Sequence, residues 1–257
     1  YDIVDCDWSS DVCSSDLMLF MLAGSLPLTF YILLFRHGEA NKNYQVSVFL
    51  KAVFYCGLFV SLYLFATSDY SLAQSLRYSF FNVISVMTTT GLSSVNFVEW
   101  GVWTSAVFML LSLSGGCTGS TSGSIKIFRW QVIYAYLHKY VLSMVEPNRV
   151  IPLKVGTVNP SQNVITSVFV YVFSFIISML FIGVIISLCG VDFNTSLAAS
   201  VACMTNVGVG SVEIIGPAGN YAFFSEPVKY LLCFAMLLGR LEVITVMVIF
   251  TKSFWRS

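Results

Sequence analysis

The sequence predicts an all-α integral membrane protein built from repeated units, each with a membrane span, a half-helix, an extended Thr-rich segment and a second span. Composition is the first observation behind this fold class. Of the 257 residues, 57% are hydrophobic and 10% are charged, and the mean hydropathy is +0.81, whereas charged residues make up about 25% of soluble domains. The other two observations are a series of long apolar stretches and a five-residue pattern that occurs twice.

The repeated pattern is Met-Thr-x-x-Gly, at residues 87–91 and 204–208. Because each copy follows a short apolar stretch, and because the copies lie 117 residues apart (91 to 208), they indicate two copies of one supersecondary unit. A Thr-rich segment between apolar helices exposes backbone carbonyls, which a membrane tolerates only beside protein or water. Rings of such carbonyls can replace the hydration shell of a permeating cation, so these segments are the candidate site.

Residues 1–17 differ from the rest of the chain. They carry five of the 13 acidic residues and no Lys or Arg, and they show no signal-peptide pattern. Residues 7–17 resemble a translated sequencing adapter at the edge of an assembled fragment, so we predict a non-native segment and leave it out of fold reasoning. The alternative is a genuine polar N-terminal tail.

Apolar stretches predict the elements of the first half of the chain. Residues 18–35 predict the end of a membrane helix, interrupted by Gly24 and Pro27. Residues 46–66 predict a complete span, since a bilayer requires about 20 apolar residues. Residues 72–86 are too short and too interrupted by polar side chains to cross, so we expect a re-entrant half-helix that leads into the first Thr-rich segment.

The second half of the chain repeats this order. We predict a span at 164–188, a half-helix at 192–203, an extended segment at 205–210 and a final span at 228–250 that contains Arg240 and Glu242. The predicted domains are residues 18–44, which end one unit and form a cytoplasmic link, residues 45–160, which form the next unit, and residues 161–257, which form the last.

The span that begins at residue 102 is interrupted after residue 113 by a run rich in Gly, Ser and Thr. The run comprises Ser114, Gly115, Gly116, Cys117, Thr118, Gly119, Ser120, Thr121, Ser122 and Gly123. Two interpretations compete. Glycines at four-residue spacing suit a continuous, closely packed helix, whereas the added Gly116 and the hydroxyls weaken a helix and favour an unwound loop that faces a pore. We favour the loop, and we expect helical structure again after Lys126, to about Met144.

Charge placement predicts the orientation. Because cytoplasmic loops are rich in Lys and Arg, the side that gathers ten of the 13 basic residues is predicted to be cytoplasmic. These ten are Arg36, Lys42, Lys51, Lys126, Arg129, Lys139, Arg149, Lys154, Lys252 and Arg256. Both Met-Thr-x-x-Gly segments then approach from outside. The formal net charge of zero argues against a nucleic-acid partner.

Arg240 is a candidate on its own, because a charge at the centre of a span costs about 2.5–3.5 kcal/mol on insertion scales. It either faces a pore or serves as a structural Arg bonded to loop carbonyls. Glu242 is two residues away, so on a helix it points elsewhere, toward another helix or cytoplasmic water.

The order of elements resembles the unit of the Trk/Ktr/HKT potassium transporters, and it is most similar to the TrkH-like branch. The residues that carry this resemblance are 88–93, 114–123, 205–210 and the pair Gly239-Arg240. The resemblance covers about residues 18–257. It implies the end of the second repeat and the whole of the third and fourth repeats of a four-repeat, K⁺-channel-like fold.

The resemblance also implies roles for particular residues. The selectivity filter is expected to comprise Thr88, Thr89, Thr90, Gly91, Thr205, Asn206, Val207 and Gly208, which hold K⁺ through backbone carbonyls. Residues 114–123 are expected to form an intramembrane gating loop below this filter, and Arg240 to face the pore. Val209 departs from the Pro that is usual at its position, which affects the expected shape of the second filter segment.

The implied function is K⁺ uptake across the bacterial inner membrane by the pore-forming subunit of a Trk-type system. The resemblance implies a homodimer, a TrkA-like cytoplasmic nucleotide-binding ring as regulator, and membrane lipid as surroundings. It implies no organic cofactor and no enzymatic activity. Two other classes are weaker: a membrane-embedded enzyme would need convergent carboxylates, His or Cys inside spans, and a structural or receptor subunit would pass no ions.

Overall fold

The structure, a computed structural model, describes residues 11–37, 44–68, 70–146, 152–156 and 158–249, with 252, 254 and 255. The basic residues Lys42, Arg149 and Arg256 and residues 1–10 lie outside the described residues. Within them the fold is helical, with two isolated β-bridges and no strand. The α-helices are α1 (Asp11–Ser25), α2 (Leu28–His37), α3 (Tyr44–Thr67), α4 (Leu72–Met87), α5 (Val102–Ser112), α6 (Ile127–Val145), α7 (Gln162–Leu188), α8 (Phe193–Met204), α9 (Glu226–Arg240) and α10 (Val243–Ile249). Three short 3-10 helices are η2 (Phe97–Trp100), η3 (Glu213–Ile215) and η4 (Tyr221–Phe223).

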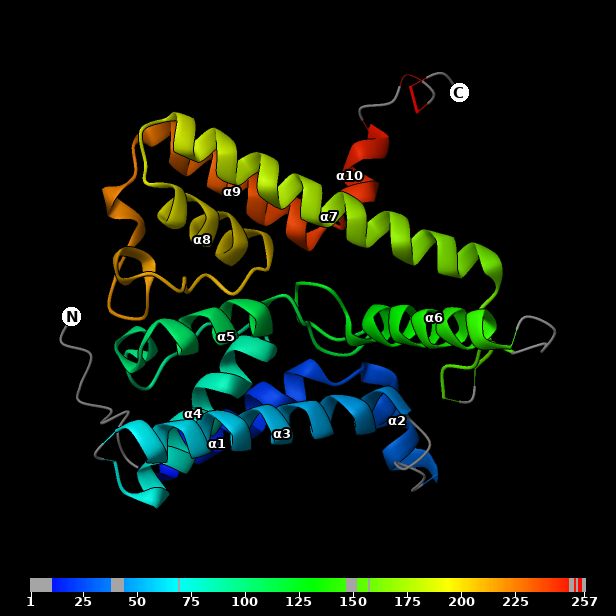
Figure 1. Cartoon of the computed structure of the whole chain (residues 1–257), viewed down its shortest axis with the longest axis horizontal. Coiled ribbons are helices and arrows are strands. Elements are labelled where there is room, and N and C mark those ends of the chain that lie inside the picture. Colours follow the sequence, from blue (N-terminus) through cyan, green and yellow to red (C-terminus); the bar gives the residue numbers. More distant parts are fainter. Residues whose placement is uncertain are drawn as a thin grey trace.

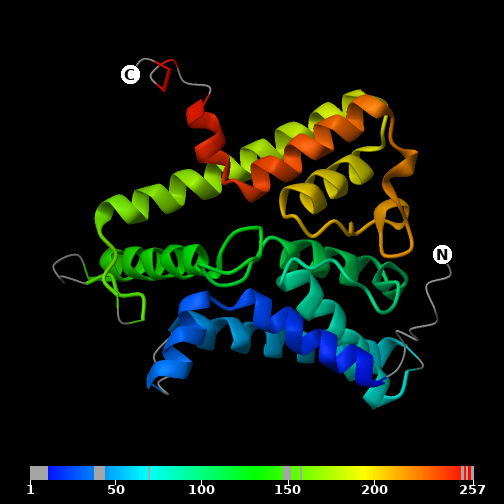
Figure 2. The same cartoon turned by 180° about the vertical axis from the view of Figure 1, so that it is seen from behind.

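The helices form two packed groups with a third segment between them (Figure 1). Helices α1 to α4 lie on one side around a core that includes Phe49, Leu64 and Met87. Helices α7, α8 and α9 lie on the other side around a core that includes Phe175 and Met204. Both views show α5, an irregular loop and α6 following one another between the groups (Figures 1 and 2).

Among the described residues, two helices are long and apolar enough to cross a membrane, namely α3 with 24 residues and α7 with 27, and the pair α1 and α2 qualifies as a bent third candidate. The predicted spans at 46–66 and 164–188 are confirmed as helices. Large apolar side chains point outward on both, for example Phe59 on α3 and Phe181 on α7, at 62% and 65% exposure. Such exposed apolar faces are expected where lipid takes the place of a protein core.

The half-helix predictions are confirmed as helices with clear start signals. Helix α4 begins after Ser71, whose hydroxyl accepts from the Gln74 N–H in a capping box, an arrangement that satisfies otherwise free amides of the first turn. Helix α8 begins after Asp192, whose carboxylate accepts from the Asn194 and Thr195 amides. The last turns of both helices are buried, and so are Thr88 and Thr205, the residues that directly follow them.

The stretch predicted as the end of one membrane helix is instead two helices. α1 and α2 meet at an angle of 96° across Leu26 and Pro27, because Pro lacks an N–H and its ring cannot continue a helix. α1 begins at Asp11, so the last residues of the segment set aside as adapter-like are helical, and Ser14 is buried. Whether residues 1–17 belong to the native protein stays a prediction.

The prediction of a single final span at 228–250 is wrong. Helix α9 ends at Arg240, and α10 starts at Val243 and leaves the line of α9 (Figure 1). Glu242 adopts a left-handed backbone with φ 64°, the conformation that commonly ends a helix. Arg240 therefore lies at the end of a helix and not at the centre of one.

Candidate functional site

The first Thr-rich segment leaves α4 through a tight backbone turn. Thr89 and Gly91 both have positive φ angles, 57° and 78°. The amides of Thr90 and Gly91 both donate to the Ser85 carbonyl, at 2.9 and 3.5 Å. This turn reverses the chain at the buried end of α4 and extends residues 90–92.

The second segment has the same backbone. Asn206 and Gly208 have φ angles of 59° and 82°, and the amides of Val207 and Gly208 donate to the Ala202 carbonyl at 3.2 and 3.1 Å. Each of these residues lies 117 positions after its counterpart in the first segment. The repeated pattern in the sequence therefore corresponds to a repeated local structure.

The two segments lie in direct contact. A Cβ atom added to Gly91 would lie 2.1 Å from the Val207 carbonyl oxygen, so only Gly fits at this approach. A Cβ added to Gly208 would have no described atom within 4 Å. The first segment thus faces the second, whereas the second faces open space on the side of Gly208.

The carbonyl oxygens of these segments are largely unused. Among the described residues, no group donates a hydrogen bond to the carbonyls of Thr89, Thr90, Asn206 or Val207. The Gly208 carbonyl is an exception, because it accepts from the Tyr221 hydroxyl at 2.7 Å. Thr90 is exposed, and Thr89 and Asn206 are partly exposed, so these free carbonyl oxygens at adjacent segments are accessible to a cation.

The run of Gly, Ser and Thr after α5 is an irregular loop. Helix α5 stops at Ser112, the next helix begins at Ile127, and the two ends of the loop are tied by a bond from the Gly115 amide to the Ile125 carbonyl at 2.6 Å. The prediction of a broken span is confirmed, and the alternative of a continuous helix packed through spaced glycines is wrong.

This loop contacts both Thr-rich segments. The Gly123 amide donates to the Thr89 hydroxyl at 2.8 Å. A Cβ added to Gly123 would lie 2.9 Å from the Thr205 carbonyl oxygen. The loop is also attached to the break between α1 and α2, because the Cys117 amide donates to the Ser25 carbonyl at 3.1 Å. It is therefore held between the first helices and the candidate site.

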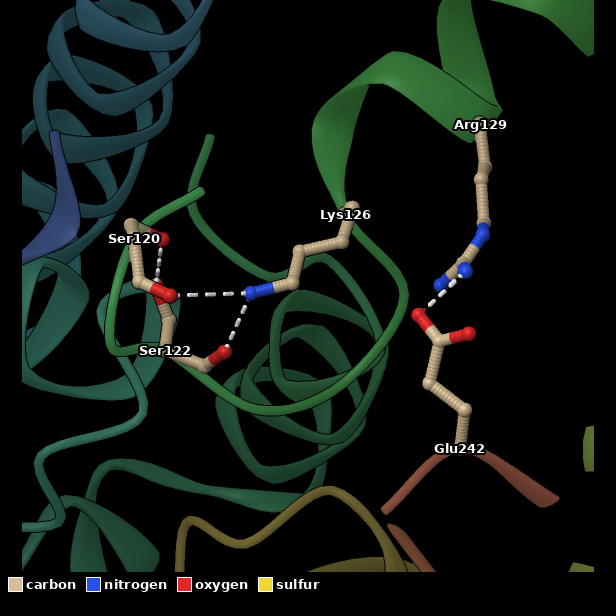
Figure 3. Close-up of polar contacts among 5 residues, drawn as sticks. All are labelled: Ser120, Ser122, Lys126, Arg129 and Glu242. Atoms are coloured by element: carbon tan, nitrogen blue, oxygen red, sulfur yellow. Dashed lines mark hydrogen bonds and ion pairs between the residues drawn. The ribbon is translucent and has the colours of Figure 1, made fainter. Parts of the chain in front are cut away.

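Charged side chains lie beside the loop (Figure 3). The Lys126 ammonium donates to the carbonyls of Ser122 and Ser120 at 2.7 and 3.3 Å. The Arg129 guanidinium pairs with the Glu242 carboxylate at 2.5 Å. Lys126, which follows the loop directly in sequence, thus holds the loop by bonding to its carbonyls. Arg129 joins α6 to the junction of α9 and α10.

Arg240 lines a cavity of about 150 Å³ together with the loop, Lys126 and Arg129. Tyr171 of α7 forms another wall, and the Arg129 guanidinium lies 3.6 Å from the centre of its ring, a close cation–π contact. Sequence reasoning placed Arg240 near the loop. It missed Lys126, Arg129 and Tyr171 as neighbours of the loop, because it treated the two basic residues as flanking charges and the tyrosine as part of an apolar span.

Glu242 meets another helix, one of the two expected environments, and its partner is Arg129. The described residues include no group of three or more His, Cys, Asp or Glu side chains that could hold a metal ion. The candidate site is accordingly built from backbone oxygens and hydroxyls, which suit a hard monovalent cation better than a transition metal.

Known proteins resemble this chain in sequence and in fold. A sequence profile of the TrkH family, described as cation transport proteins, matches residues 46–257. The Trk system potassium uptake protein TrkI of Halomonas elongata is 36% identical over 247 residues, which are 93% of this chain and 49% of that protein. The protein named TrkH of the same organism is 30% identical over 96% of this chain and 50% of its own length.

Among solved structures, the crystal structure of the potassium transporter TrkH from Vibrio parahaemolyticus matches with a TM-score of 0.88. The match covers 96% of this chain and 53% of that one at 24% identity, and it shows a shared fold. The chain spans about half the length of the curated relatives it matches. Profile, relatives and fold agree, and the chain belongs to the TrkH family of cation transport proteins.

Proposed function

We propose that this chain supplies two of the four walls of a K⁺ pathway in a Trk-type uptake system of the bacterial inner membrane. The observation that carries the proposal is the pair of adjacent Thr-rich segments with the same backbone and unused carbonyl oxygens. Carbonyl rings of this kind can replace the water around a permeating ion. The relatives' names, Trk system potassium uptake proteins, support K⁺ as the ion.

The filter in this proposal comprises residues 88–91 and 205–208. Gly91 and Val207 are in contact, so the two segments lie side by side. Two segments enclose an ion on one side alone. In this proposal the other two filter segments belong to the remaining half of a protein of the relatives' length. They would lie next to the open side of Gly208.

The loop at 114–123 is the gate in this proposal. It touches Thr89 and Thr205 directly, and it lines a cavity together with the basic residues Lys126, Arg129 and Arg240. Positive charges at the mouth of a pore raise the energy of an entering cation. Movement of the loop, together with the helices that hold it, would open the path.

The partners in this proposal are those that the family resemblance of the sequence implies. A Trk-type system would assemble this subunit as a homodimer in the membrane, with a TrkA-like cytoplasmic nucleotide-binding ring as regulator. Such a ring would act on the side of the basic residues, where α6 and the junction of α9 and α10 meet through the ion pair of Arg129 with Glu242.

The test uses a protein of full family length that carries this sequence, reconstituted into liposomes. We expect ⁸⁶Rb⁺ and K⁺ uptake well above that of empty liposomes and a clear preference over Na⁺. The same protein should restore growth of a bacterium that lacks K⁺ uptake systems at low external K⁺. A correctly inserted protein that passes no Rb⁺ would contradict the proposal and would favour a structural or receptor subunit.

A further inference from the structure

A second cavity, of about 620 Å³, lies between α6, the start of α3 and residues 152–155. In Figure 1 these elements meet at the edge of the molecule opposite the turn between α7 and α8. Its volume falls in the range of about 300–1,000 Å³ that is usual for ligand pockets. A Cβ added to Gly156 would lie 2.6 Å from the Tyr44 ring, so the segment that closes the cavity packs directly on α3. The cavity is a formed pocket and is separate from the filter and its loop.

One face of α6 supplies the main wall. Trp130, Gln131, Tyr134, His138, Lys139 and Leu142 all line the cavity. They recur at spacings of three and four residues, which places them on one side of a helix. The other side of α6 packs on α7, where Tyr136 meets Phe169 with the ring centres 5.1 Å apart. Helix α6 thus uses one face for the fold and presents the other to the cavity.

The charged side chains that line this pocket are all basic. Lys139 and Lys154 line it with His138, and none of its lining residues in the described chain is Asp or Glu. Both polar atoms of the Gln131 amide are buried and have no hydrogen-bond partner among the described residues. Because unpaired buried polar groups are costly, the Gln131 amide suits a ligand that offers it an acceptor and a donor, and the two lysines suit a negative charge on that ligand.

We propose that the pocket binds the headgroup and upper acyl chain of an anionic glycerophospholipid, such as phosphatidylglycerol, from the cytoplasmic leaflet. The phosphate accepts from Lys139, Lys154 and the Gln131 NH₂ group, and a glycerol hydroxyl donates to the Gln131 carbonyl oxygen. The acyl chain lies against Trp130, beyond Gln131 on the side away from Lys139. Basic pockets beside membrane helices on the cytoplasmic side are typical sites for such headgroups.

The position of the pocket favours a lipid over a soluble ligand. The pocket adjoins the first turns of α3. The distribution of basic residues assigns this end of the α3 span to the cytoplasmic surface. Trp130 and Tyr134 are partly exposed at its mouth, at 36% and 73%, and aromatic side chains with a polar edge are enriched at the level of the headgroups. The assignment rests on the membrane orientation proposed above.

The test is quenching of Trp130 fluorescence by brominated lipids in a full-length protein that retains Trp130 as its only tryptophan. Brominated phosphatidylglycerol should quench at a much lower mole fraction than brominated phosphatidylcholine. The double variant Lys139→Gln/Lys154→Gln should lose this preference, by about fivefold for each lysine removed. The control Lys51→Gln, which removes an exposed lysine of α3 outside the pocket, should keep it.

Gln131→Leu is a second variant that keeps the charges and the approximate volume, and it should weaken phosphatidylglycerol quenching without changing that by phosphatidylcholine. Equal quenching by both lipids in the wild-type protein would overturn the proposal. Absence of quenching by either lipid would also overturn it, because a protein segment would then cover Trp130. The measurement requires insertion and no ion flux, so its outcome is independent of the transport test.

Discussion

Thr89 and Asn206 occupy equivalent positions in the two Thr-rich segments, and both have left-handed backbones, with φ near 57° and 59°. Such a backbone costs an L-residue about 1–2 kcal/mol and is held by its surroundings. Here the side chains supply that support. The Thr89 hydroxyl accepts from the Gly123 amide, and the Asn206 amide donates to the Met236 carbonyl at 3.3 Å. Each strained residue therefore ties its segment to a neighbouring element.

Replacing Thr89 with Val should loosen the loop. The shapes are alike, but the Gly123 amide loses its acceptor, which costs about 1–3 kcal/mol for a buried donor. We expect the full-length transporter to pass more K⁺ in the absence of its regulator, by about fivefold or more. Thr89→Ser keeps the hydroxyl and should behave as wild type in ⁸⁶Rb⁺ flux. Equal flux from all three proteins would show that this contact does not hold the loop.

Gly91→Ser and Gly208→Ser should each lower the preference for K⁺ over Na⁺, by about fivefold or more, since a side chain at positive φ costs about 1–2 kcal/mol. Gly190→Ser is a matched control. Its φ is 89° with no described atom within 4 Å of an added Cβ, and it lies in the turn between α7 and α8, away from the filter. Paired Rb⁺ and Na⁺ fluxes measure the preference for K⁺ over Na⁺. If Gly190→Ser loses this preference as well, general backbone strain and not the filter position explains the loss.

At the scale of elements, the loop between α5 and α6 is attached at its ends and its middle. The Gly115 and Ile127 amides pair with the Ile125 and Gly116 carbonyls at its ends. Its middle is attached to the Ser25 carbonyl and to the Lys126 side chain. The loop is thus a defined element with fixed contacts to the first helices, to the first Thr-rich segment and to Lys126.

Deleting residues 116–122 should raise K⁺ flux without the regulator. The ends of the deletion are close together, because a Cβ on Gly115 would lie 2.3 Å from the Gly123 carbonyl oxygen, so α5 and α6 can keep their places. Lys126→Gln removes one attachment of the loop and should act in the same direction with a smaller effect. Arg240→Ala should also raise flux by removing a positive charge from the cavity beside the loop.

These variants are compared by ⁸⁶Rb⁺ uptake, with membrane insertion checked by detergent extraction and size-exclusion chromatography. If the deletion and Arg240→Ala insert normally while flux stays at or below wild type, the loop serves packing and is not a gate.

At the scale of the whole molecule, the chain holds two Thr-rich segments, and Gly208 faces open space. Carbonyls from one side cannot replace the full hydration shell of an ion. We therefore expect residues 1–257 expressed alone to insert but not to restore growth of a K⁺-uptake-deficient bacterium at low K⁺. A protein of full family length carrying this sequence should restore it. Growth supported by the 257-residue chain alone would refute the requirement for four walls.

Composition, spacing and short-range signals in the sequence determined the class of fold and most element positions. The long apolar stretches of α3 and α7, the cap at Ser71 and the repeat at 87–91 depend on residues close together in the chain. The breakdown of helix after Ser112 is equally local, because Gly and hydroxyl side chains weaken a helix wherever they gather.

Only the tertiary structure decided which distant residues meet. The contact of Gly91 with Val207, the bond from Gly123 to Thr89, and the ion pair of Arg129 with Glu242 join residues far apart in sequence. The break after α9 belongs with them, because it divides an apolar stretch that would otherwise suit one span. Periodicity reports the face of a helix, but it carries no information about the element that covers that face.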